Sequence, residues 1–499
     1  MRALVVTSVG VTCAAALTLP LATPAASAPA PHSASARPPS MSPEAPGAGP
    51  PSAQAEATTR EAFAPSDVRS AAEPAGSTQS LPLAPLATPS DRVAGAPAAQ
   101  GLPQRDARPF SLVGVVWDDA EAELHGTVQV RTRATGTTRW SDWQDVETHN
   151  AEHAADLGSA EREGRTVRGA TAPLWVGDSD GVEVRVRPEA PDPQDRAATS
   201  VPLPEGMRLE LVDPGEGPGD DRAPEPARGA PAGRAAAVPA GFADTPATAA
   251  VLPEILTAET AAASAVNAEL AELGATVIPA LSRAQTLESV ELAPGAKPYI
   301  GPRPGIVTRK GWGADEKLRE KSFAYTKTVK AAFVHHSATG NNYTCKQAPS
   351  VLRSIYRYHV KSSGWRDFGY NFAVDKCGNI YEGRAGGVTK AVLGAHTLGF
   401  NSNTMGIAVL GSYASTNPPA AAVTAVSKLT AWKLGLFGGN PKGKVTLVSG
   451  GSNKYKAGVK VKMNVISGHR DGFATECPGA RLYKKLGKAR TSSAKLQGR

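Results

Sequence analysis

The stretch Val329-Lys-Ala-Ala-Phe-Val-His335 is almost entirely apolar, as expected for a strand that is buried on both faces. A histidine at the end of such a strand is held in place, and its side chain points into a cleft beyond the sheet edge. Residues 348–361 carry an amphipathic helical pattern, with Pro349 in the first turn. Other strand-like and helical runs alternate after it, at 370–375, 380–383, 405–410, 418–436, 444–467 and 480–490. This mixture predicts an α/β fold for residues 298–490, with a mixed central β-sheet flanked by helices.

Two boundaries in this region follow from local chemistry. Asn417 is a suitable N-cap for the helix predicted at 418–436, because its side chain can accept a backbone N–H. The last predicted helix, at 480–490, is basic, and residues 491–499 are expected to form a tail.

The charge of the chain is unevenly distributed. Among its 499 residues, positions 301–499 hold 32 Lys and Arg against 8 Asp and Glu, whereas the first 300 hold 22 against 38. This asymmetry argues against one uniform globular fold. A chain disordered throughout is equally disfavoured, because the last 200 residues contain enough apolar and aromatic side chains for a core.

The N-terminus has the features of a secretory signal peptide over residues 1–28. Arg2 precedes an apolar run, and Ala26-Ser27-Ala28 is a small-residue cleavage pattern. A later cut at Ala34-Ser35-Ala36 and a membrane anchor are the alternatives. No other stretch reaches the ~18 apolar residues of a membrane span.

The remaining N-terminal part divides into three segments. Residues 29–107 are rich in Ala and Pro and predict disorder, because they cannot bury enough apolar surface. Residues 108–213 contain short β-branched runs at 111–117, 126–132, 181–187 and 207–212, which predict a small all-β, sandwich-like module. Residues 214–297 resemble a linker, with a possible short helix within 253–273.

Two tryptophans of the β module admit two interpretations. Trp140 and Trp143 could form a platform for stacking against sugars, or they could contribute to core packing. In a strand, positions three apart face opposite sides, so one of the two is expected to pack inward.

The histidines and cysteines suggest three kinds of chemistry. Cys13 is lost with the signal peptide, so Cys345, Cys377 and Cys477 remain, and one disulfide leaves one thiol outside it. His335, His469 and Cys477 could hold zinc and leave one position open. Cys477 could instead be a nucleophile beside a histidine, since it precedes a predicted helix. A buried thiol beside a hydrogen-bonded histidine is the third possibility.

Eight short motifs from Gly311 onward occur together in one order. They are Gly311-Trp-Gly-Ala314, Phe333-Val-His-His-Ser-Ala-Thr339, Gly364-Trp-Arg-Asp-Phe-Gly-Tyr-Asn-Phe372, Ile380-Tyr-Glu-Gly-Arg384, Gly394-Ala-His396, Gly399-Phe-Asn-Ser-Asn403, Gly406-Ile-Ala-Val-Leu-Gly411 and Gly468-His-Arg-Asp471 with Glu476-Cys-Pro-Gly479. With these motifs the region 303–490 resembles the peptidoglycan recognition proteins and type 2 N-acetylmuramoyl-L-alanine amidases, which include phage T7 lysozyme-like enzymes.

The resemblance implies a zinc enzyme that cleaves the amide between the lactyl group of N-acetylmuramic acid and L-alanine of the stem peptide. By position, His335, His469 and Cys477 match the zinc ligands, and Tyr370 matches the tyrosine that faces the metal. Thr475 matches a site that holds threonine in many animal-type members and lysine in the phage type. Tyr370 and Thr475 are therefore the predicted catalytic residues beside zinc.

Further residues match substrate-contacting positions of the family. His359 is predicted to contact substrate or to pack as a helix histidine, and a substrate contact is favoured for His396. Arg384 is predicted to contact the stem-peptide carboxylate, or else to pair with an acid such as Asp375 or Glu382. His336 is expected to be structural, because it faces the opposite side of the strand from His335.

The resemblance also implies a disulfide near the first helix, between Cys345 and Cys377. One departure concerns the stem peptide: Ala385-Gly386 stand where members preferring diaminopimelate often carry Gly-Trp, so that preference does not transfer.

The sequence thus predicts a secreted zinc amidase that acts on peptidoglycan outside the cell or in the cell wall. The alternative is a non-catalytic peptidoglycan-binding protein; relatives that lack the cysteine ligand tend not to hydrolyse. A cysteine hydrolase using Cys477 and His469 is the third hypothesis. No nucleic-acid motif accompanies the basic charge, which we expect to favour anionic cell-wall polymers. No membrane span is expected in the mature chain.

Overall fold

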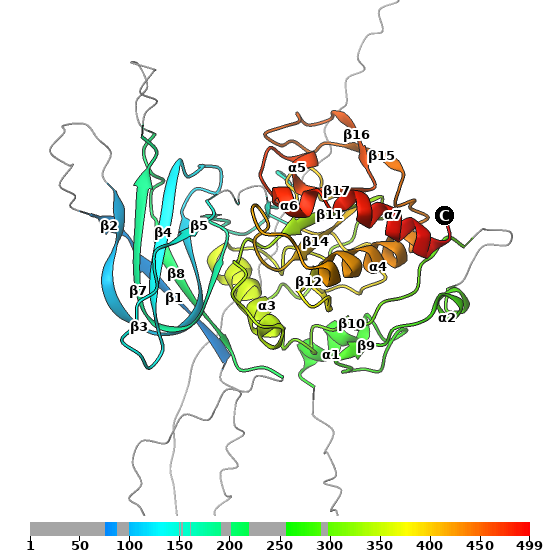
Figure 1. Cartoon of the computed structure of the whole chain (residues 1–499), viewed down its shortest axis with the longest axis horizontal. Helices are drawn as coiled ribbons and strands as arrows, with labels where there is room; N and C mark the ends of the chain where they lie inside the picture. Colours follow the sequence, from blue (N-terminus) through cyan, green and yellow to red (C-terminus); the bar gives the residue numbers. More distant parts are fainter. Residues whose placement is uncertain are drawn as a thin grey trace, which may run out of the picture. The chain divides into compact units, whose positions relative to one another are not determined.

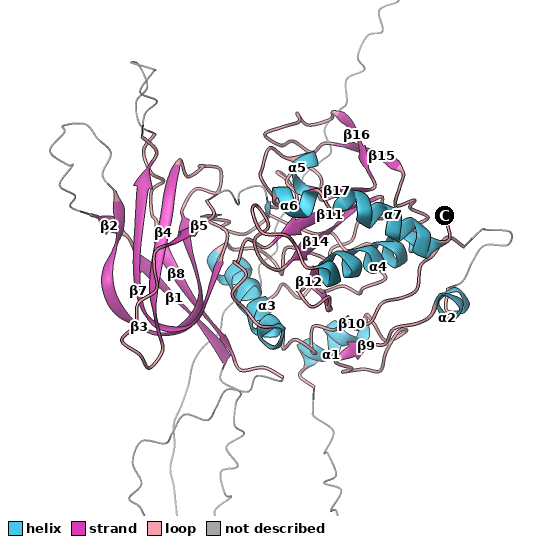
Figure 2. Ribbon diagram, viewed as in Figure 1, coloured by secondary structure: helices cyan, strands magenta, loops and turns pink. Residues whose placement is uncertain are grey.

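The computed structural model describes residues 75–86, 99–148, 150, 153–159, 161–190, 201–218, 256–290 and 298–499, and the predicted signal peptide lies outside these ranges. The described residues form an all-β module and a mixed α/β domain (Figures 1 and 2). No helix in the described ranges has the length and apolar character that crossing a membrane would require.

The β module is an eight-stranded sheet in which every pairing is antiparallel. The main strand order is β1-β8-β3-β7-β4-β5, with β2 and β6 paired to β3. The strands are β1 (Ala75–Pro82), β2 (Ala84–Pro85), β3 (Gln100–Trp117), β4 (Gly126–Ala134), β5 (Gln144–Val146), β6 (Gly169–Ala170), β7 (Leu174–Pro188) and β8 (Arg208–Gly215). The four strand-like runs predicted between 108 and 213 coincide with β3, β4, β7 and β8, so the prediction of an all-β module is confirmed.

Disorder was predicted up to residue 107, and this is wrong for β1, β2 and the first part of β3. The prediction rested on composition, because residues 29–107 have few apolar side chains. However, a polar strand can still extend an existing sheet through backbone hydrogen bonds. The edge strand β1 pairs with β8 in this way, and the Gln79 side-chain amide also donates to the carbonyl of Arg108 at 2.9 Å.

The two tryptophans considered for sugar stacking lie against arginines instead. The Arg185 guanidinium carbon is 3.9 Å from the ring centre of Trp143, and that of Arg131 is 5.1 Å away. Arg131 and Arg133 lie 5.7 and 5.8 Å from the ring centre of Trp140. Both tryptophans are half-buried and lie outside the hydrophobic core of the module, so neither is packed inward as a core residue.

The α/β domain contains a seven-stranded mixed sheet of order β17-β11-β14-β12-β13-β10-β9 and a separate hairpin of β15 and β16. Its strands are β9 (Val277–Ile278), β10 (Ile306–Val307), β11 (Ala331–His336), β12 (Phe372–Val374), β13 (Ile380–Glu382), β14 (Thr404–Val409), β15 (Lys444–Val448), β16 (Lys460–Asn464) and β17 (Ile466–Gly468). Its helices are α1 (Ala258–Ala265), α2 (Arg283–Glu288), η3 (Cys345–Gln347), α3 (Ala348–Arg357), η4 (Tyr358–Ser362), α4 (Ala420–Leu436), α5 (His469–Gly472), α6 (Ala480–Tyr483) and α7 (Leu486–Gln497). The predicted mixed sheet with flanking helices is therefore confirmed.

Alternate residues of the central strands feed two different cores. Phe372 and Val374 of β12 belong to the cluster that contains the α4 residues Val426 and Leu429. Ala373, between them, belongs to the cluster that contains residues of α3. Because successive strand residues face opposite sides, α4 and α3 must cover opposite faces of the sheet, as Figure 1 shows.

Three predicted boundaries of this domain change. The helix α4 has Pro419 at its N-cap and no side-chain cap bond, so Asn417 is not the cap. Residues 491–497 of the predicted tail belong to the helix α7. Gln497 is buried there, and its side-chain amide donates to the carbonyl of Ala431 at 2.9 Å. The predicted linker contains α1, in agreement with the possible helix, but β9 of the same segment pairs with β10 and belongs to the domain.

The β module and α3 share one buried core. Leu112, Val116 and Val212 of the module belong to the same cluster as Val351 and Leu352 of α3. All the described residues belong to a single compact unit. The β module therefore lies directly against the domain that carries the predicted site residues.

Candidate metal centre

Two neighbouring parallel strands bring together the three predicted metal ligands. His335 is near the end of β11, and β17 pairs with β11 in parallel, so the carboxyl ends of both strands lie at the same sheet edge. Directly after β17, His469 is the first residue of α5, and Cys477 follows in the next loop. All three side chains are completely buried. The sequence prediction that these residues lie close together agrees with this geometry.

A fourth residue, His153 of the β module, joins this cluster. The candidate ligand atoms of His153, His335, His469 and Cys477 all lie within 4.8 Å of one another. Cys477 Sγ is 3.7 Å from His153 Nε2 and 3.8 Å from His335 Nδ1. The sequence analysis did not identify His153. Its only local signal is a histidine in a polar stretch without strand or helix periodicity.

The donor set fits zinc. With Zn–S of about 2.3 Å and Zn–N of about 2.0–2.1 Å, a tetrahedral site has S···N edges of about 3.6 Å. The two S···N distances, 3.7 and 3.8 Å, are close to that value. Imidazole nitrogen and thiolate sulfur are also the donors that zinc prefers.

Burial keeps His335 and His153 in the protonation state that binds metal. Loss of solvation lowers the pKa of His335 and of His153 well below the usual value, and neighbouring histidines lower both further. A neutral imidazole has a ring nitrogen available as a ligand. His336, on the other face of β11, lies outside the cluster: its Nδ1 accepts from the backbone N–H of Tyr413 at 3.4 Å, in agreement with a structural role.

The two predicted catalytic residues lie at different places relative to the cluster. Tyr370 is buried, with its ring centre 5.3 Å from that of His335 and 5.8 Å from that of His153. Thr475 is partly exposed, and its hydroxyl accepts the backbone N–H of Cys477 at 3.1 Å. Tyr370 is thus beside the cluster, whereas the observed bond of Thr475 supports the loop that carries Cys477.

His359 and His396, the predicted substrate contacts, are buried near the cluster. His396 has its ring centre 5.3 Å from that of His335, and its ring nitrogens lie 3.0 and 3.3 Å from the hydroxyls of Thr397 and Thr404. His359 stacks on Trp365 at 4.3 Å. Its Nδ1 also accepts the backbone N–H of Gly369. Both ring nitrogens of His396 and the Nδ1 of His359 are therefore already bonded to protein groups in this structure.

Arg384 forms an ion pair that the sequence analysis did not foresee. Its Nη2 lies 2.6 Å from Glu161 Oε1 of the β module, and both side chains are buried. Its other nitrogens donate to the carbonyls of Phe368 and Leu393 at 2.9 and 3.0 Å. Pairing with an acid was one of the two predicted alternatives, and the acid is Glu161 instead of the suggested Asp375 or Glu382.

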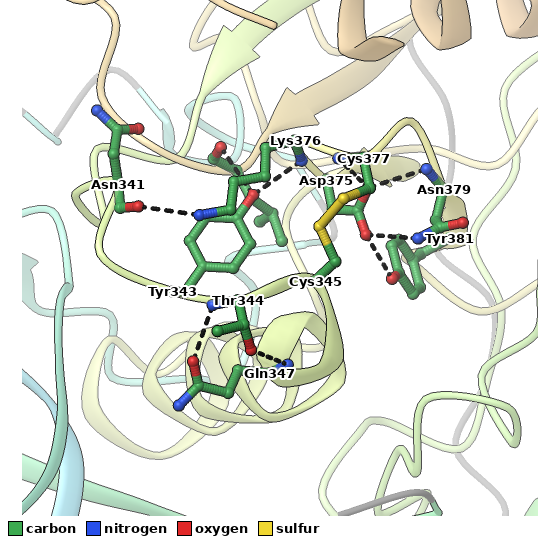
Figure 3. Close-up of a disulfide and its surroundings, with 11 residues drawn as sticks. Asn341, Tyr343, Thr344, Cys345, Gln347, Asp375, Lys376, Cys377, Asn379 and Tyr381 are labelled. Carbon is green, nitrogen blue, oxygen red and sulfur yellow. Dashed lines mark hydrogen bonds between the residues drawn. A yellow bond between two sulfur atoms is a disulfide. The ribbon is translucent and has the colours of Figure 1, made fainter.

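The predicted disulfide between Cys345 and Cys377 is present, with Cα atoms 6.2 Å apart. Figure 3 shows that it joins the short helical turn before α3 to the turn between β12 and β13. The carboxylate of Asp375 stabilises that second turn by accepting from the backbone N–H of Cys377 and the side-chain amide of Asn379. Cys477 is outside any disulfide and is buried.

Comparison with known proteins places both parts of the chain. Residues 65–205 match a family described as Rv3811 N-terminal galactose-binding domain-like, and residues 325–480 match the family described as N-acetylmuramoyl-L-alanine amidase. Peptidoglycan-recognition protein SC2 of Drosophila melanogaster is 31% identical over 183 residues, which are 36% of this chain and 84% of that protein. Human N-acetylmuramoyl-L-alanine amidase is 31% identical over 187 residues, 37% of this chain and 28% of that protein. The solved structure of wild-type Drosophila PGRP-LB is 26% identical, with a TM-score of 0.29, over 36% of this chain and 91% of that one.

The α/β domain is thus of the N-acetylmuramoyl-L-alanine amidase type. Peptidoglycan-recognition protein SC2 is matched over 84% of its own length, so the likeness covers most of that protein. The chain belongs to the peptidoglycan recognition protein family, which confirms the resemblance inferred from its motifs.

Proposed function

We propose that this chain is a secreted, zinc-dependent N-acetylmuramoyl-L-alanine amidase that hydrolyses the bond between the muramic acid lactyl group and L-alanine in peptidoglycan. One observation carries the proposal: His335, His469 and Cys477 converge in a buried cluster, with Tyr370 beside it. Three protein ligands of this kind on one domain are the arrangement found in catalytic zinc sites.

The chain's own residues divide the work of the reaction. His335, His469 and Cys477 hold the metal, which when bound supplies Lewis-acid activation of water and of the scissile carbonyl. The Tyr370 hydroxyl either donates a hydrogen bond to the developing oxyanion or passes a proton to the leaving amine. The Thr475 hydroxyl, on the loop that carries Cys477, is a further hydrogen-bond donor. His359, His396 and Arg384 would contact the glycan and stem peptide after the protein groups bonded to them in this structure are displaced.

Two features support secretion and action on cell walls. A disulfide persists in oxidising compartments and is rare in the cytosol, and this domain has one between Cys345 and Cys377. The basic charge of residues 301–499 favours adhesion to walls that contain anionic polymers. Peptidoglycan and these polymers are therefore the proposed partners.

The test is digestion of purified peptidoglycan by the zinc-loaded full chain, with and without a zinc chelator. The amidase releases new L-alanine amino termini without new reducing sugar ends, and chelation abolishes the release. A cysteine hydrolase using Cys477 and His469 would keep its activity in chelator. Absence of new amino termini from walls of every stem-peptide type, with the wild type and with His153→Ala alike, would overturn the proposal.

A second function, a non-catalytic peptidoglycan-binding protein, is favoured by one specific observation. His153 adds a fourth donor to the cluster, and zinc sites with four protein ligands are typically structural. Binding of peptidoglycan without release of amino termini would support this alternative.

A further inference from the structure

The segment from Glu147 to Arg168, between β5 and β6 of the β module, makes polar contacts with the α/β domain. We call it the 147–168 segment; residues 149, 151, 152 and 160 within it are outside the described ranges. The Arg168 backbone N–H donates to the carbonyl of Ser363 at 3.1 Å. The Arg165 guanidinium lies 2.6 Å from the carboxylate of Glu320. The segment is therefore fixed to the domain near its C-terminal end.

The middle of the segment is anchored next to the candidate metal centre. Asp156 Oδ1 accepts the backbone N–H of Gly399 at 2.7 Å and the side-chain amide of Asn401 at 2.8 Å. The same Asn401 accepts the backbone N–H of His396 at 2.7 Å through its side-chain oxygen. These bonds hold the chain three residues after His153 against the loop that contains a predicted substrate contact.

His153 occupies the position that hydrolysis requires to be open. It is 5% exposed, and its Nε2 is 3.7 Å from Cys477 Sγ, an edge of the tetrahedral donor set. Its ring centre lies 4.5 Å from that of His469. A catalytic zinc keeps three protein ligands and a fourth position for water or substrate. With His153 as fourth ligand, no coordination position of a tetrahedral zinc remains for water.

Glu161 pairs with Arg384, the second group that the substrate is expected to contact. Its carboxylate lies 2.6 Å from Arg384, and both side chains are at most 5% exposed. A carboxylate and a guanidinium at this distance form a charge-assisted bond. Any substrate carboxylate that binds Arg384 must first displace Glu161. The segment therefore blocks two positions that the substrate needs: the open metal position and the Arg384 guanidinium.

We propose that the 147–168 segment is an autoinhibitory element that holds the amidase centre in a closed state, with His153 as the fourth zinc ligand and Glu161 as a substitute for a substrate carboxylate. This inference rests on the proposed function, because a recognition protein without hydrolytic activity has nothing to inhibit. Only open molecules bind substrate, so the apparent affinity of the mixture is lower than that of the open state by the fraction of molecules that are open. Release of the segment raises hydrolysis without any change in the three ligands of the α/β domain.

The test combines the zinc environment with hydrolysis, both measured on the full chain. X-ray absorption at the zinc edge counts imidazole and sulfur ligands in the wild type, in His153→Ala and in His125→Ala. His125 is an exposed histidine of the same module and serves as the matched control. Release of L-alanine amino termini from peptidoglycan is measured on the same samples. Glu161→Gln, with Glu163→Gln as its exposed control, tests the second contact without touching a ligand.

We expect three imidazoles and one sulfur in the wild type and two imidazoles and one sulfur in His153→Ala. Hydrolysis rises at least tenfold in His153→Ala and severalfold in Glu161→Gln, whereas both controls match the wild type. Two imidazoles in the wild type would overturn the ligand assignment of His153. Equal, measurable hydrolysis by the wild type and His153→Ala would overturn the inhibition and leave the proposed amidase intact. Absence of hydrolysis in every zinc-loaded variant would instead refute the amidase, and the inhibition with it.

Discussion

The disulfide between Cys345 and Cys377 allows a quantitative prediction. Replacing both residues by alanine removes a cross-link between positions 32 residues apart in sequence. In the chain-entropy model, a link of this length costs the unfolded chain about 3.7 kcal/mol at 25 °C, and the folded domain loses that stabilisation when the link is removed. For a cooperative unit of about 150–250 residues, this loss corresponds to a decrease in Tm of roughly 7–15 °C.

The assay is thermal unfolding of the zinc-loaded chain, followed by tryptophan fluorescence. Trp312 and Trp432 are buried in the α/β domain and report on its unfolding. A reductant provides the matched control: it should lower the Tm of the wild type to that of the double variant and leave the variant unchanged. Zinc content should stay the same, because none of the four cluster residues lies on the two segments that the disulfide joins. A difference below about 1 kcal/mol would refute the loop-closure reasoning.

Three further predictions concern the site and the charge. Cys477→Ala should weaken zinc binding and abolish hydrolysis, because it removes the thiolate ligand. Tyr370→Phe should retain zinc and lose about 10²-fold or more in kcat. Metal analysis and peptidoglycan digestion measure both, and unchanged zinc affinity and activity in Cys477→Ala would contradict the ligand assignment. Burial lowers the pKa of His396 from 6.5 to about 3, so below pH 6.5 only the unfolded chain takes up this proton. Between pH 7.5 and 5.5, this residue alone should therefore lower the free energy of unfolding by about 1.4 kcal/mol in total as the pH falls. His396→Gln should reduce the difference between metal-free urea titrations at these two pH values by that amount, and an unchanged difference would contradict it. Binding to purified walls should weaken as salt increases, and salt-independent binding would transfer that role from the basic domain to the β module.

Local patterns in the sequence predicted the elements that carry the ligands. The apolar run that ends at His335 became β11, because a strand covered on both faces needs apolar residues at every position. Strand-like runs at 405–410, 370–375 and 380–383 likewise predicted β14, β12 and β13. Sequence pattern alone did not establish the roles of His469 and Cys477. Their spacing matches no common zinc motif, and only the family resemblance distinguished a zinc site from a nucleophile.

The predictions that failed depend on partners distant in the sequence. Composition indicated disorder for residues 75–82, yet β8 supplies the hydrogen bonds that order them. Residues 491–499 were expected to form a tail, yet α7 is fixed by the contact of Gln497 with α4. In both cases the stabilising surface belongs to another element. A window of neighbouring residues contains no information about such a surface.

The cluster of four donors shows the same limitation at the centre of the molecule. His153 and Cys477 are 324 positions apart, and their side chains meet only because the core shared by the β module and α3 aligns the two parts. The sequence therefore predicts a three-ligand centre, which is what the α/β domain contributes alone. The full chain adds a fourth candidate donor, His153, and the carboxylate of Glu161, both of which are buried. Only measurements on the full chain can therefore report whether the 147–168 segment holds hydrolysis back.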